Sequence, residues 1–224
     1  MSREQSLEQL KRAIITGDPD LARTAAKTAI SAGMSTSDVL INGCCEGLSA
    51  VGVIGDKCKK RQYWIFEVLE ALEAFEAAVD VIKPRQKKGK VVIGSVANDP
   101  HDFGKDFVVA MLEAMGFEVH DLGKAVSADV FIQKALEIKA DLVAASAGTN
   151  TALLDQRDLA EKLKIAGIRN KIKYVVGGWC CTPEWAAEIK ADGYGADALE
   201  ALKIAEEVLG KLKEERKTLN KKKE

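Results

Sequence analysis

The sequence has 224 residues, a hydrophobic content of 47% and a formal net charge of -1, with 33 Lys and Arg residues against 34 Asp and Glu residues. This length suits one large or two small domains with buried cores, and the absence of an overall positive charge argues against nucleic acid or an acidic membrane surface as a partner. Its apolar runs are shorter than the ~20 residues that span a bilayer and its amino terminus is not signal-like, so we expect a cytoplasmic protein.

Residues 1–84 are predicted to form a four-helix bundle, because their apolar residues recur at helical spacing. Asp18 before Pro19 is typical of a helix start, the stretch from Ser35 to Asp38 offers a second start, and Pro84 is expected to end the last helix. The spacing points to a set of packed positions, namely Leu7, Leu10, Ile14, Leu21, Ala25, Leu69, Leu72, Phe75, Val79 and Ile82.

The third predicted helix is rich in glycine, with Gly43, Gly47, Gly52 and Gly55. Each glycine in a helix interior costs about 1 kcal/mol relative to alanine, so a close approach must offset that cost. A neighbouring helix and a flat ligand would both benefit from the space, and the sequence alone leaves the choice open.

A flavodoxin-like, Rossmann-type domain is predicted at residues 91–212, after a polar, basic linker at 85–90. Amphipathic helical stretches alternate there with short apolar runs at residues 91–96, 117–122, 141–146, 172–176 and, briefly, 192–194. This alternation predicts a five-stranded parallel sheet with helices on both faces. Ser127 and Thr182 are placed as helix N-caps, and the basic segment 213–224 is expected to be a frayed, solvated tail.

Five cysteines are present: the adjacent pair Cys44 and Cys45, the single Cys58, and the adjacent pair Cys180 and Cys181. Their arrangement lacks the Cys-x-x-Cys spacing of zinc or redox sites. We interpret them as reduced thiols that behave as small hydrophobic side chains where they are buried.

The candidate binding residues lie in the loops after the first, third and fourth strands, because ligands of open α/β sheets bind outside the carboxyl ends of the strands. They are Asp99, His101, Asp102 and Gly104 in the first of these loops, Ser146, Thr149 and Thr151 in the next, and Gly177 and Gly178 in the last. No Gly-x-Gly-x-x-Gly follows the first strand, and a flavodoxin's phosphate loop is also missing, which argues against nicotinamide and flavin cofactors. The Gly-x-Gly-x-x-Ala at residues 193–198 lies at the last strand and is interpreted as a tight turn.

His101 is the candidate metal ligand of the first loop. An imidazole that binds a metal through one nitrogen normally gives its other N–H to a carboxylate, and Asp99 lies two residues away. Gly104 would let the backbone approach a bulky ligand. A solvated loop histidine beside a turn-forming aspartate remains an alternative, and the second histidine, His120, is expected to pack in or at the end of the second strand.

The motif Asp-x-His-x-x-Gly, here Asp99, His101 and Gly104, resembles that of the cobalamin-binding corrinoid proteins of methyltransferase systems, including the methylamine and methanol types. It is also similar to the equivalent module of cobalamin-dependent methionine synthase. Ser146 after the third strand and the pair Gly177 and Gly178 after the fourth support the resemblance. Bundle, linker and α/β domain follow in the family's order, so the resemblance covers essentially the whole chain.

The resemblance implies a cobalamin bound with its dimethylbenzimidazole base off cobalt, in a cleft beside the sheet, and with His101 as the lower cobalt ligand. Asp99 would then bond to His101, Ser146 would face the tail, and Gly177 with Gly178 would leave the tail room. The segment Tyr-Trp-Ile-Phe-Glu at residues 63–67 resembles the family's bundle segment that shields the upper face of the corrin.

The resemblance also implies a non-catalytic carrier subunit rather than a complete enzyme. A substrate-specific methyltransferase would load the methyl group, giving methylcobalamin, and a second methyltransferase would pass it to a thiol or tetrahydrofolate. A reductive activase is a further candidate partner. The hard chemistry would belong to the cofactor, because no side chain supplies a nucleophile strong enough for a poorly activated methyl group.

Two features depart from the family pattern. The family reads Ser-x-Leu after the third strand, whereas Ser146 is followed here by Ala147 and Gly148. A second hydroxyl completes the histidine–aspartate network in some relatives, and Thr149 and Thr151 are both candidates for it. The sequence Trp-Cys-Cys at residues 179–181 is also atypical after the glycine pair.

Three alternatives remain open. A cobalamin-dependent mutase module shares the histidine loop, but its chemistry does not usually face a helical bundle. A cobalamin-based sensor would need a DNA-binding element, and the sequence contains no basic recognition segment beside its two domains. A domain of this fold that holds no corrin is the third alternative, because fold alone does not establish function.

Overall fold

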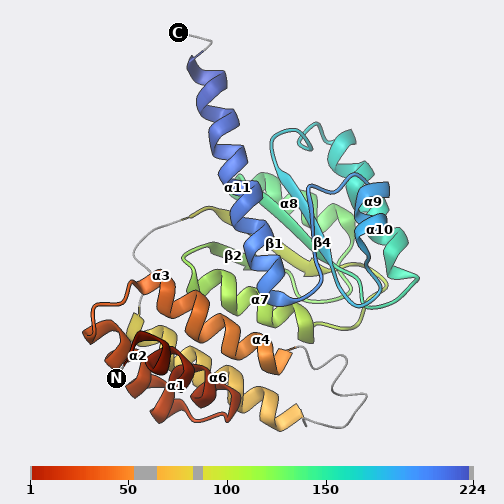
Figure 1. Cartoon of the computed structure of the whole chain (residues 1–224). Coiled ribbons are helices and arrows are strands. Elements are labelled where there is room, and N and C mark those ends of the chain that lie inside the picture. The colour runs from red at the N-terminus through yellow and green to blue at the C-terminus, as the bar shows by residue number, and fades with distance from the viewer. Residues whose placement is uncertain (1, 53–64, 83–87, 222–224) are drawn as a thin grey trace. The chain divides into compact units, whose positions relative to one another are not determined.

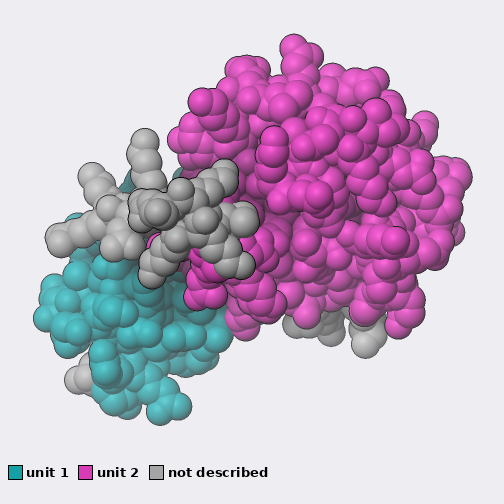
Figure 2. All heavy atoms as spheres, turned by 90° about the horizontal axis from the view of Figure 1, so that it is seen from above, with its two compact units in different colours: residues 1–86, 110–116 teal, residues 87–109, 117–224 magenta. Residues whose placement is uncertain are grey.

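A computed structural model describes residues 2–52, 65–82 and 88–221. The chain divides into two compact units, one built on residues 1–86 and 110–116 and the other on 87–109 and 117–224 (Figure 2). Several residues named above lie outside the described residues, namely Gly55, Cys58, Tyr63, Trp64, Pro84 and residues 85–87 of the linker. Among the helices that are described, none is long and apolar enough to cross a membrane.

The first unit contains the helical bundle that the sequence predicts (Figure 1). Its helices are α1 (Arg3–Ile15), α2 (Pro19–Ser31), α3 (Thr36–Val39), a π-helical segment (Leu40–Cys45), α4 (Glu46–Gly52) and α6 (Ile65–Ile82). The side chain of Asp18 accepts a hydrogen bond from Leu21 N–H at the start of α2, and Ser35 accepts one from Asp38 N–H at the start of α3. Both predicted helix starts are therefore confirmed, and each satisfies a backbone donor that a helix leaves unpaired.

Small side chains let α2 and α6 pack closely in the bundle. The buried residues of α2 are alanines, and α6 buries its own small residues together with Val68, Phe75 and Ile82. The prediction that Leu69 packs in the core is wrong, because its side chain is 49% exposed, and Leu72 is only half-buried. The centre of the interface falls on the alanine rows, so the larger leucines lie beside it rather than in it.

The glycines of the third helical segment make room for α1. A Cβ atom at Gly43 would lie 2.7 Å from Leu10 Cδ2, and one at Gly47 would lie 3.1 Å from Lys11 Cα. Both distances are tighter than ordinary van der Waals contact. A neighbouring helix, rather than a flat ligand, therefore accounts for the glycines at these two positions.

The second unit is the predicted five-stranded parallel sheet. Its strands are β1 (Lys90–Ser95), β2 (Glu118–Asp121), β3 (Leu142–Ser146), β4 (Lys173–Gly177) and β5 (Gly193–Gly195), in the order β2-β1-β3-β4-β5. All the pairings are parallel. This order is the flavodoxin-like one, in which the chain reverses direction across the sheet between β1 and β3, where such folds bind their ligands.

Helices cover both faces of this sheet, as Figure 1 shows. They are α8 (Ala128–Ile138), α9 (Ala152–Ile165), α10 (Pro183–Glu188) and α11 (Ala198–Lys221), together with the first part of α7 (Phe103–Ala114), whose residues 110–114 belong to the first unit. One core joins α8, α9 and α10 to alternate residues of the strands, including Val92 and Tyr174. The intervening residues, such as Val91 and Val175, are buried on the opposite face, which explains why the strands read as continuous apolar runs.

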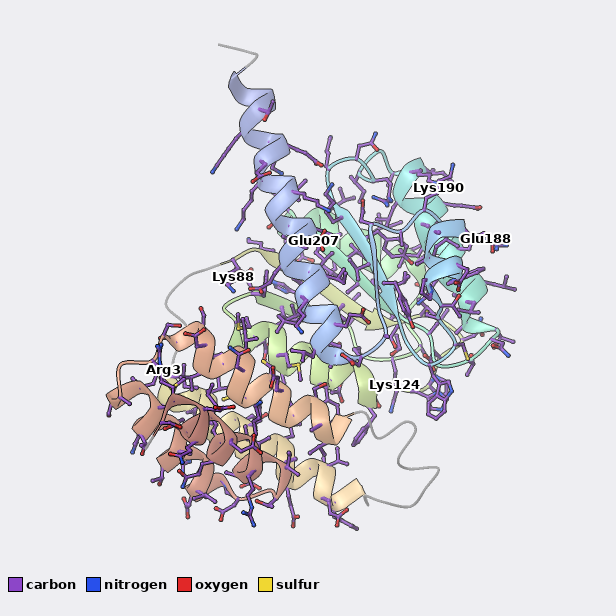
Figure 3. The ribbon with its side chains drawn as sticks, viewed as in Figure 1. Arg3, Lys88, Lys124, Glu188, Lys190 and Glu207 are labelled. Atoms are coloured by element: carbon purple, nitrogen blue, oxygen red, sulfur yellow. The ribbon has the colours of Figure 1, made fainter. Side chains whose placement is uncertain are left out.

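Of the two N-caps predicted in this unit, one forms a capping hydrogen bond through its side chain and the other does not. Thr182 accepts a hydrogen bond from Trp185 N–H as the N-cap of α10, whereas Ser127 is the N-cap of α8 by position but its side chain makes no capping hydrogen bond. Glu188 at the end of α10 forms an ion pair with Arg157 of α9 (Figure 3).

The carboxyl-terminal segment differs from the prediction of a frayed tail, because α11 continues to Lys221. Arg216 of this helix donates to Asp141 Oδ1 at 2.6 Å, and Glu215 pairs with Lys173 at 3.1 Å. On its exposed side Glu207 pairs with Lys211, four residues later (Figure 3). These contacts hold the basic segment in helical form beyond Leu212.

The glycine-rich segment at residues 193–195 is strand β5, so the interpretation as a tight turn is wrong there. A Cβ atom at Gly195 would lie 2.7 Å from Ala201 Cα, and one at Gly193 would collide with Ile204 Cγ2. The two glycines are therefore required by the close packing of β5 against α11.

Candidate functional site

The carboxyl ends of β1, β3 and β4 bring the three candidate loops together. Ser95 at the end of β1 is in register with Ser146 at the end of β3, and Ser146 is in register with Gly177 at the end of β4. The loops that leave these residues therefore start side by side, at the edge of the sheet where the chain reverses direction.

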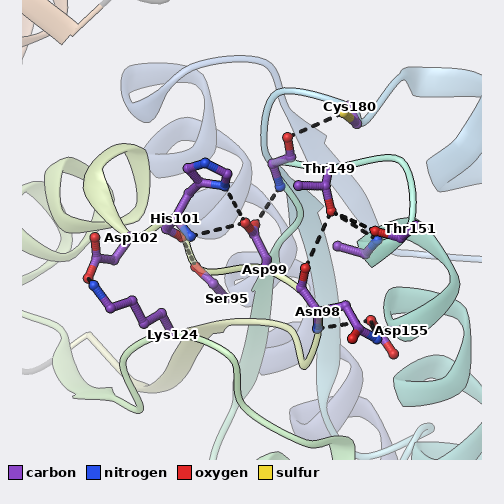
Figure 4. A network of polar contacts seen from close by, with 12 residues as sticks. Ser95, Asn98, Asp99, His101, Asp102, Lys124, Thr149, Thr151, Asp155 and Cys180 are labelled. Atoms are coloured by element: carbon purple, nitrogen blue, oxygen red, sulfur yellow. Dashed lines mark hydrogen bonds and ion pairs between the residues drawn. The ribbon is translucent and has the colours of Figure 1, made fainter.

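A histidine–aspartate pair lies at the centre of this edge (Figure 4). His101 Nδ1 lies 2.7 Å from Asp99 Oδ1, and His101 N–H donates to the same oxygen at 3.1 Å. The side chain of Asp99 is fully buried, whereas that of His101 is 66% exposed. With Nδ1 bonded to a carboxylate, the other ring nitrogen, Nε2, points away from Asp99 and is the one that can bind a metal.

The backbone of the first loop is fixed from several directions. Ser95 Oγ donates to His101 O at 2.6 Å, and the backbone oxygen of Asp99 accepts from Ala125 N–H at 3.0 Å. Asn98 donates from both its backbone and its side chain to Asp155 Oδ2 of α9. The imidazole is thus exposed to solvent on a rigid loop, which is the preorganisation that a ligand site needs.

The second oxygen of Asp99 accepts a hydrogen bond from the loop after β3. The loops after β3 and β4 are called the third loop and the fourth loop. Gly148 N–H donates to Asp99 Oδ2, so both oxygens of this buried carboxylate are used. Thr149 Oγ1 instead accepts from Ala152 N–H at 3.2 Å and lies 3.1 Å from Thr151 Oγ1. In the part of the chain that the structure describes, a backbone N–H therefore takes the place for which the two threonine hydroxyls were candidates.

Asp102 and Gly104 have different surroundings. Asp102 forms an ion pair with Lys124 at 3.1 Å, and this hydrogen-bonded lysine lowers the pKa of the carboxyl group (Figure 4). Asp102 is thus held toward Lys124. A Cβ atom at Gly104 would have no atom within 4 Å, so the first turn of α7 is open to a bulky neighbour.

The glycine pair after β4 packs against protein. A Cβ atom at Gly177 would lie 2.9 Å from Gly195 O. Gly178 has φ +106°, and a Cβ there would lie 2.5 Å from Ala147 N and 2.7 Å from Ala147 C. Contact between the third and fourth loops already requires glycine at 178, before any ligand is considered. Ser146 is half-buried at the end of β3.

The buried side-chain amide of Gln156 forms hydrogen bonds with the strand ends from which these loops leave. Gln156 of α9 is fully buried, and its Nε2 donates to Ala145 O at 2.9 Å and to Gly177 O at 3.1 Å. Its Oε1 accepts from Trp185 Nε1 at 3.0 Å and from Cys181 Sγ at 3.1 Å. One side chain thereby ties the ends of β3 and β4 to α10.

None of the described cysteines is in a disulfide bond, which agrees with their interpretation as reduced thiols. Burial raises the pKa of the Cys181 thiol to about 11, and burial also raises the pKa of Cys44. These two thiols therefore stay protonated at neutral pH, which agrees with their interpretation as packing residues.

The residues of this network that were not predicted from the sequence include Ser95, Asn98, Gly148 and Asp155. Ser95 carried a signal, since it is a polar residue in an otherwise apolar strand, and it is fully buried. Gly148 acts through its backbone N–H, which every residue except proline possesses, so no sequence signal could have singled it out.

The comparisons with known proteins identify the family. The family described as B12 binding domain matches residues 89–203, and a second family with the same description matches residues 6–83. Trimethylamine corrinoid protein 2 of Methanosarcina acetivorans is 38% identical over 208 residues, which are 89% of this chain and 94% of that protein. This chain belongs to the B12-binding corrinoid proteins.

Solved structures of the family agree with the fold. A novel cobalamin-binding protein from Desulfitobacterium hafniense DCB-2 is 26% identical, with a TM-score of 0.71, and the match covers 93% of this chain and 98% of that one. The monomethylamine corrinoid protein of Methanosarcina barkeri is 28% identical, with a TM-score of 0.64, and the match covers 92% of this chain and 100% of that one. The resemblance, the fold class and the expectation of a corrinoid cofactor are confirmed.

Proposed function

We propose that this chain carries a methyl group on the cobalt of a bound cobalamin, with His101 Nε2 as the lower cobalt ligand and the benzimidazole base off cobalt. The observation that carries the proposal is the hydrogen bond of 2.7 Å between an exposed imidazole and a buried carboxylate. It lies at the edge of the sheet where folds of this topology bind their ligands.

The residues present fit a corrinoid. Asp99 Oδ1 holds the proton on His101 Nδ1, which leaves the lone pair on Nε2 for a metal and fixes the orientation of the ring. The open first turn of α7 at Gly104 leaves space beside the histidine for a large planar group. We assign Ser146, Gly177 and Gly178 to the binding of the nucleotide tail, and Thr149 and Thr151 stay cofactor-binding candidates in the loop after β3.

The chain's own part in the reaction is to position the metal-binding nitrogen of His101 and to keep a proton on the other ring nitrogen, Nδ1. When bound, cobalamin supplies a metal centre that accepts and releases a methyl group, which no side chain here can do. When His101 Nε2 is not ligated, Asp99 still orients the imidazole through its contact with Nδ1. We assign Asp102 to the rim of the loop, where its ion pair with Lys124 holds it.

The relatives support a carrier between two enzymes. Trimethylamine, dimethylamine and monomethylamine corrinoid proteins match nearly the full length of this chain. We therefore infer a methylated amine or a similarly small methyl compound as the donor, and a substrate-specific methyltransferase as the first partner. The second partner is a methyltransferase with a thiol or tetrahydrofolate acceptor, and a reductive activase restores the cobalt when it is oxidised.

The domain roles follow from this assignment. Residues 1–84 form the cap for the upper face of the corrin, 85–90 the linker, 91–212 the cobalamin-binding domain and 213–224 a basic terminal segment. A mutase or sensor module is the alternative, and the match of residues 6–83 to a B12-binding family favours the carrier.

Reconstitution tests the proposal. Apo protein mixed with hydroxocobalamin and passed through a desalting column is expected to emerge coloured, with about one cobalt per chain, as a single ligating histidine implies. Reduction to cobalt(I) and addition of methyl iodide should then give the absorption spectrum of a methyl–cobalt bond. A colourless eluate from folded protein would contradict corrinoid binding, and coloured protein that resists methylation would favour the mutase or sensor alternative.

A further inference from the structure

We propose that Gly148 is a positioning residue for the cobalt ligand: its backbone N–H holds Asp99, and through it His101, so that the third and fourth loops set the orientation of the imidazole. This inference rests on the proposed function of His101. It concerns a residue two positions after Ser146, in a segment for which the sequence offered only hydroxyl side chains as candidates.

The two oxygens of Asp99 divide their contacts between two loops. Oδ1 accepts from His101 Nδ1 and His101 N–H, and Oδ2 accepts from Gly148 N–H. A carboxylate bonded on one oxygen alone can swing about its χ2 torsion, whereas one bonded on both is fixed in plane. The contact from Gly148 therefore restricts the direction in which Asp99 presents its acceptor to the imidazole.

An added Cβ atom at position 148 would crowd the histidine–aspartate pair. A Cβ atom at Gly148 would lie 3.2 Å from each oxygen of Asp99 and 3.3 Å from His101 Nδ1. Gly148 is not one of the glycines with positive φ, so its backbone conformation does not by itself demand glycine. The close approach to the histidine–aspartate pair accounts for the missing side chain.

The peptide group that carries Gly148 N–H is also held at its other end. Its carbonyl belongs to Ala147, and this oxygen accepts from Cys180 N–H at 3.3 Å. Cys180 Sγ also donates to Gly148 O at 3.4 Å. A chain of hydrogen bonds thus runs from Cys180 N–H through this peptide to Asp99 and His101, and such chains polarise and strengthen their members.

These hydrogen bonds give a role to the atypical Trp-Cys-Cys segment. Cys180 contacts the peptide units on both sides of Gly148, and Gly178 packs on Ala147 from the same loop. The fourth loop therefore braces the third, and the third holds the carboxylate that orients the ligand.

Gly148→Ala tests the proposal, with Gly210→Ala as the matched control. Gly210 lies in α11, where an added Cβ meets no atom within 4 Å. In apo protein labelled with nitrogen-15 histidine, the Nδ1–H signal of His101 is expected to shift or broaden in Gly148→Ala and to stay unchanged in Gly210→Ala. In the cobalt(II) protein, Gly148→Ala should lose the nitrogen splitting of the electron paramagnetic resonance spectrum while still retaining cobalamin.

The outcomes separate this inference from the proposed function. Parent protein without nitrogen splitting from histidine contradicts the ligand assignment itself. Parent protein with the splitting, and Gly148→Ala with both signals unchanged, overturns the role of Gly148 alone. If Gly148→Ala does not fold, the amide proton of Gly148 in the folded parent protein decides. Slow hydrogen exchange and a coupling across the hydrogen bond to the carboxylate carbon of Asp99 support the proposal, and fast exchange without this coupling overturns it.

Discussion

Gly178→Ala is expected to lower the free energy of unfolding of the apo protein by about 2–6 kcal/mol. Gly178 has φ +106°, where a residue with a Cβ is strained by about 1–3 kcal/mol. The new atom would also lie 2.5 Å from Ala147 N, and overpacking of this kind typically costs about 1–3 kcal/mol. Urea unfolding followed by circular dichroism measures the sum.

Gly167→Ala is the matched control for this change. Gly167 also has positive φ, at +70°, but a Cβ there would meet no atom within 4 Å. Only the backbone contribution of about 1–2 kcal/mol is therefore expected. Equal losses in the two variants would show that the contact between the third and fourth loops is not tight, and that close packing does not require the glycine pair.

Lys105→Met is expected to lower the free energy of unfolding by about 2 kcal/mol. This loss lies between those expected for exposed ion pairs and for buried ones. The side chain of Lys105 is 1% exposed, and its Nζ lies 2.6 Å from both Asp106 and Asp121. It ties the first turn of α7 to the end of β2. Methionine keeps the apolar stem but leaves two carboxylates without their buried partner, and both retain some contact with water.

The pH dependence of this loss has a defined sign. Burial lowers the pKa of Lys105, but hydrogen bonds to Asp106 and Asp121 outweigh it and raise the pKa above its usual value. A raised pKa gives stability that is fully present below the unfolded pKa of about 10.4 and disappears as pH rises through the folded pKa. The difference between parent and Lys105→Met should therefore be constant near neutral pH and shrink above about pH 10.4.

Lys134→Met provides the comparison, because Lys134 pairs with Glu137 on the exposed side of α8 at 2.8 Å. Such helical surface pairs contribute about 0.3–0.5 kcal/mol. Chemical denaturation at several pH values gives the loss of unfolding free energy in Lys105→Met and in Lys134→Met. A loss in Lys105→Met no larger than that in Lys134→Met would contradict the structural role of the buried lysine.

Periodicity predicted most of the fold. The runs around Val92 and Tyr174 carry buried apolar residues on both faces because helices cover both faces of a parallel sheet, and few arrangements besides this one produce such runs. The phase of α6 was harder to predict. A spacing rule places Leu69 in the core, but alanine-on-alanine packing with α2 shifts the interface, and only the partner helix reveals that.

In the site, too, contacts between residues close in sequence could be predicted, whereas contacts with distant residues could not. The pairing of His101 with Asp99 was predictable, since a short loop brings a metal-binding residue type beside a carboxylate. The contact from Gly148 was not, because a backbone N–H reaches across from a loop that lies 49 residues away in sequence. The helical form of the segment after Leu212 was missed for a similar reason, since it depends on the distant partners Asp141 and Lys173.

The assignment of His101 as cobalt ligand can be tested selectively by isotopic labelling, because the chain has only two histidines. The second, His120, lies in β2 with its Nε2 3.1 Å from Glu118 Oε1. Replacing His120 with asparagine is therefore expected to leave the cobalt spectrum unchanged. Replacing His101 with alanine should remove the nitrogen ligand.

The most direct measurement is the electron paramagnetic resonance spectrum of cobalt(II) cobalamin bound to protein labelled with nitrogen-15 histidine, with an unlabelled cofactor. A nitrogen-14 ligand splits each cobalt line into a triplet, and a nitrogen-15 ligand splits it into a doublet. We predict triplets in unlabelled protein and doublets in labelled protein, because His101 has replaced the benzimidazole. Triplets that persist after labelling, or lines without nitrogen splitting in either sample, would contradict this assignment.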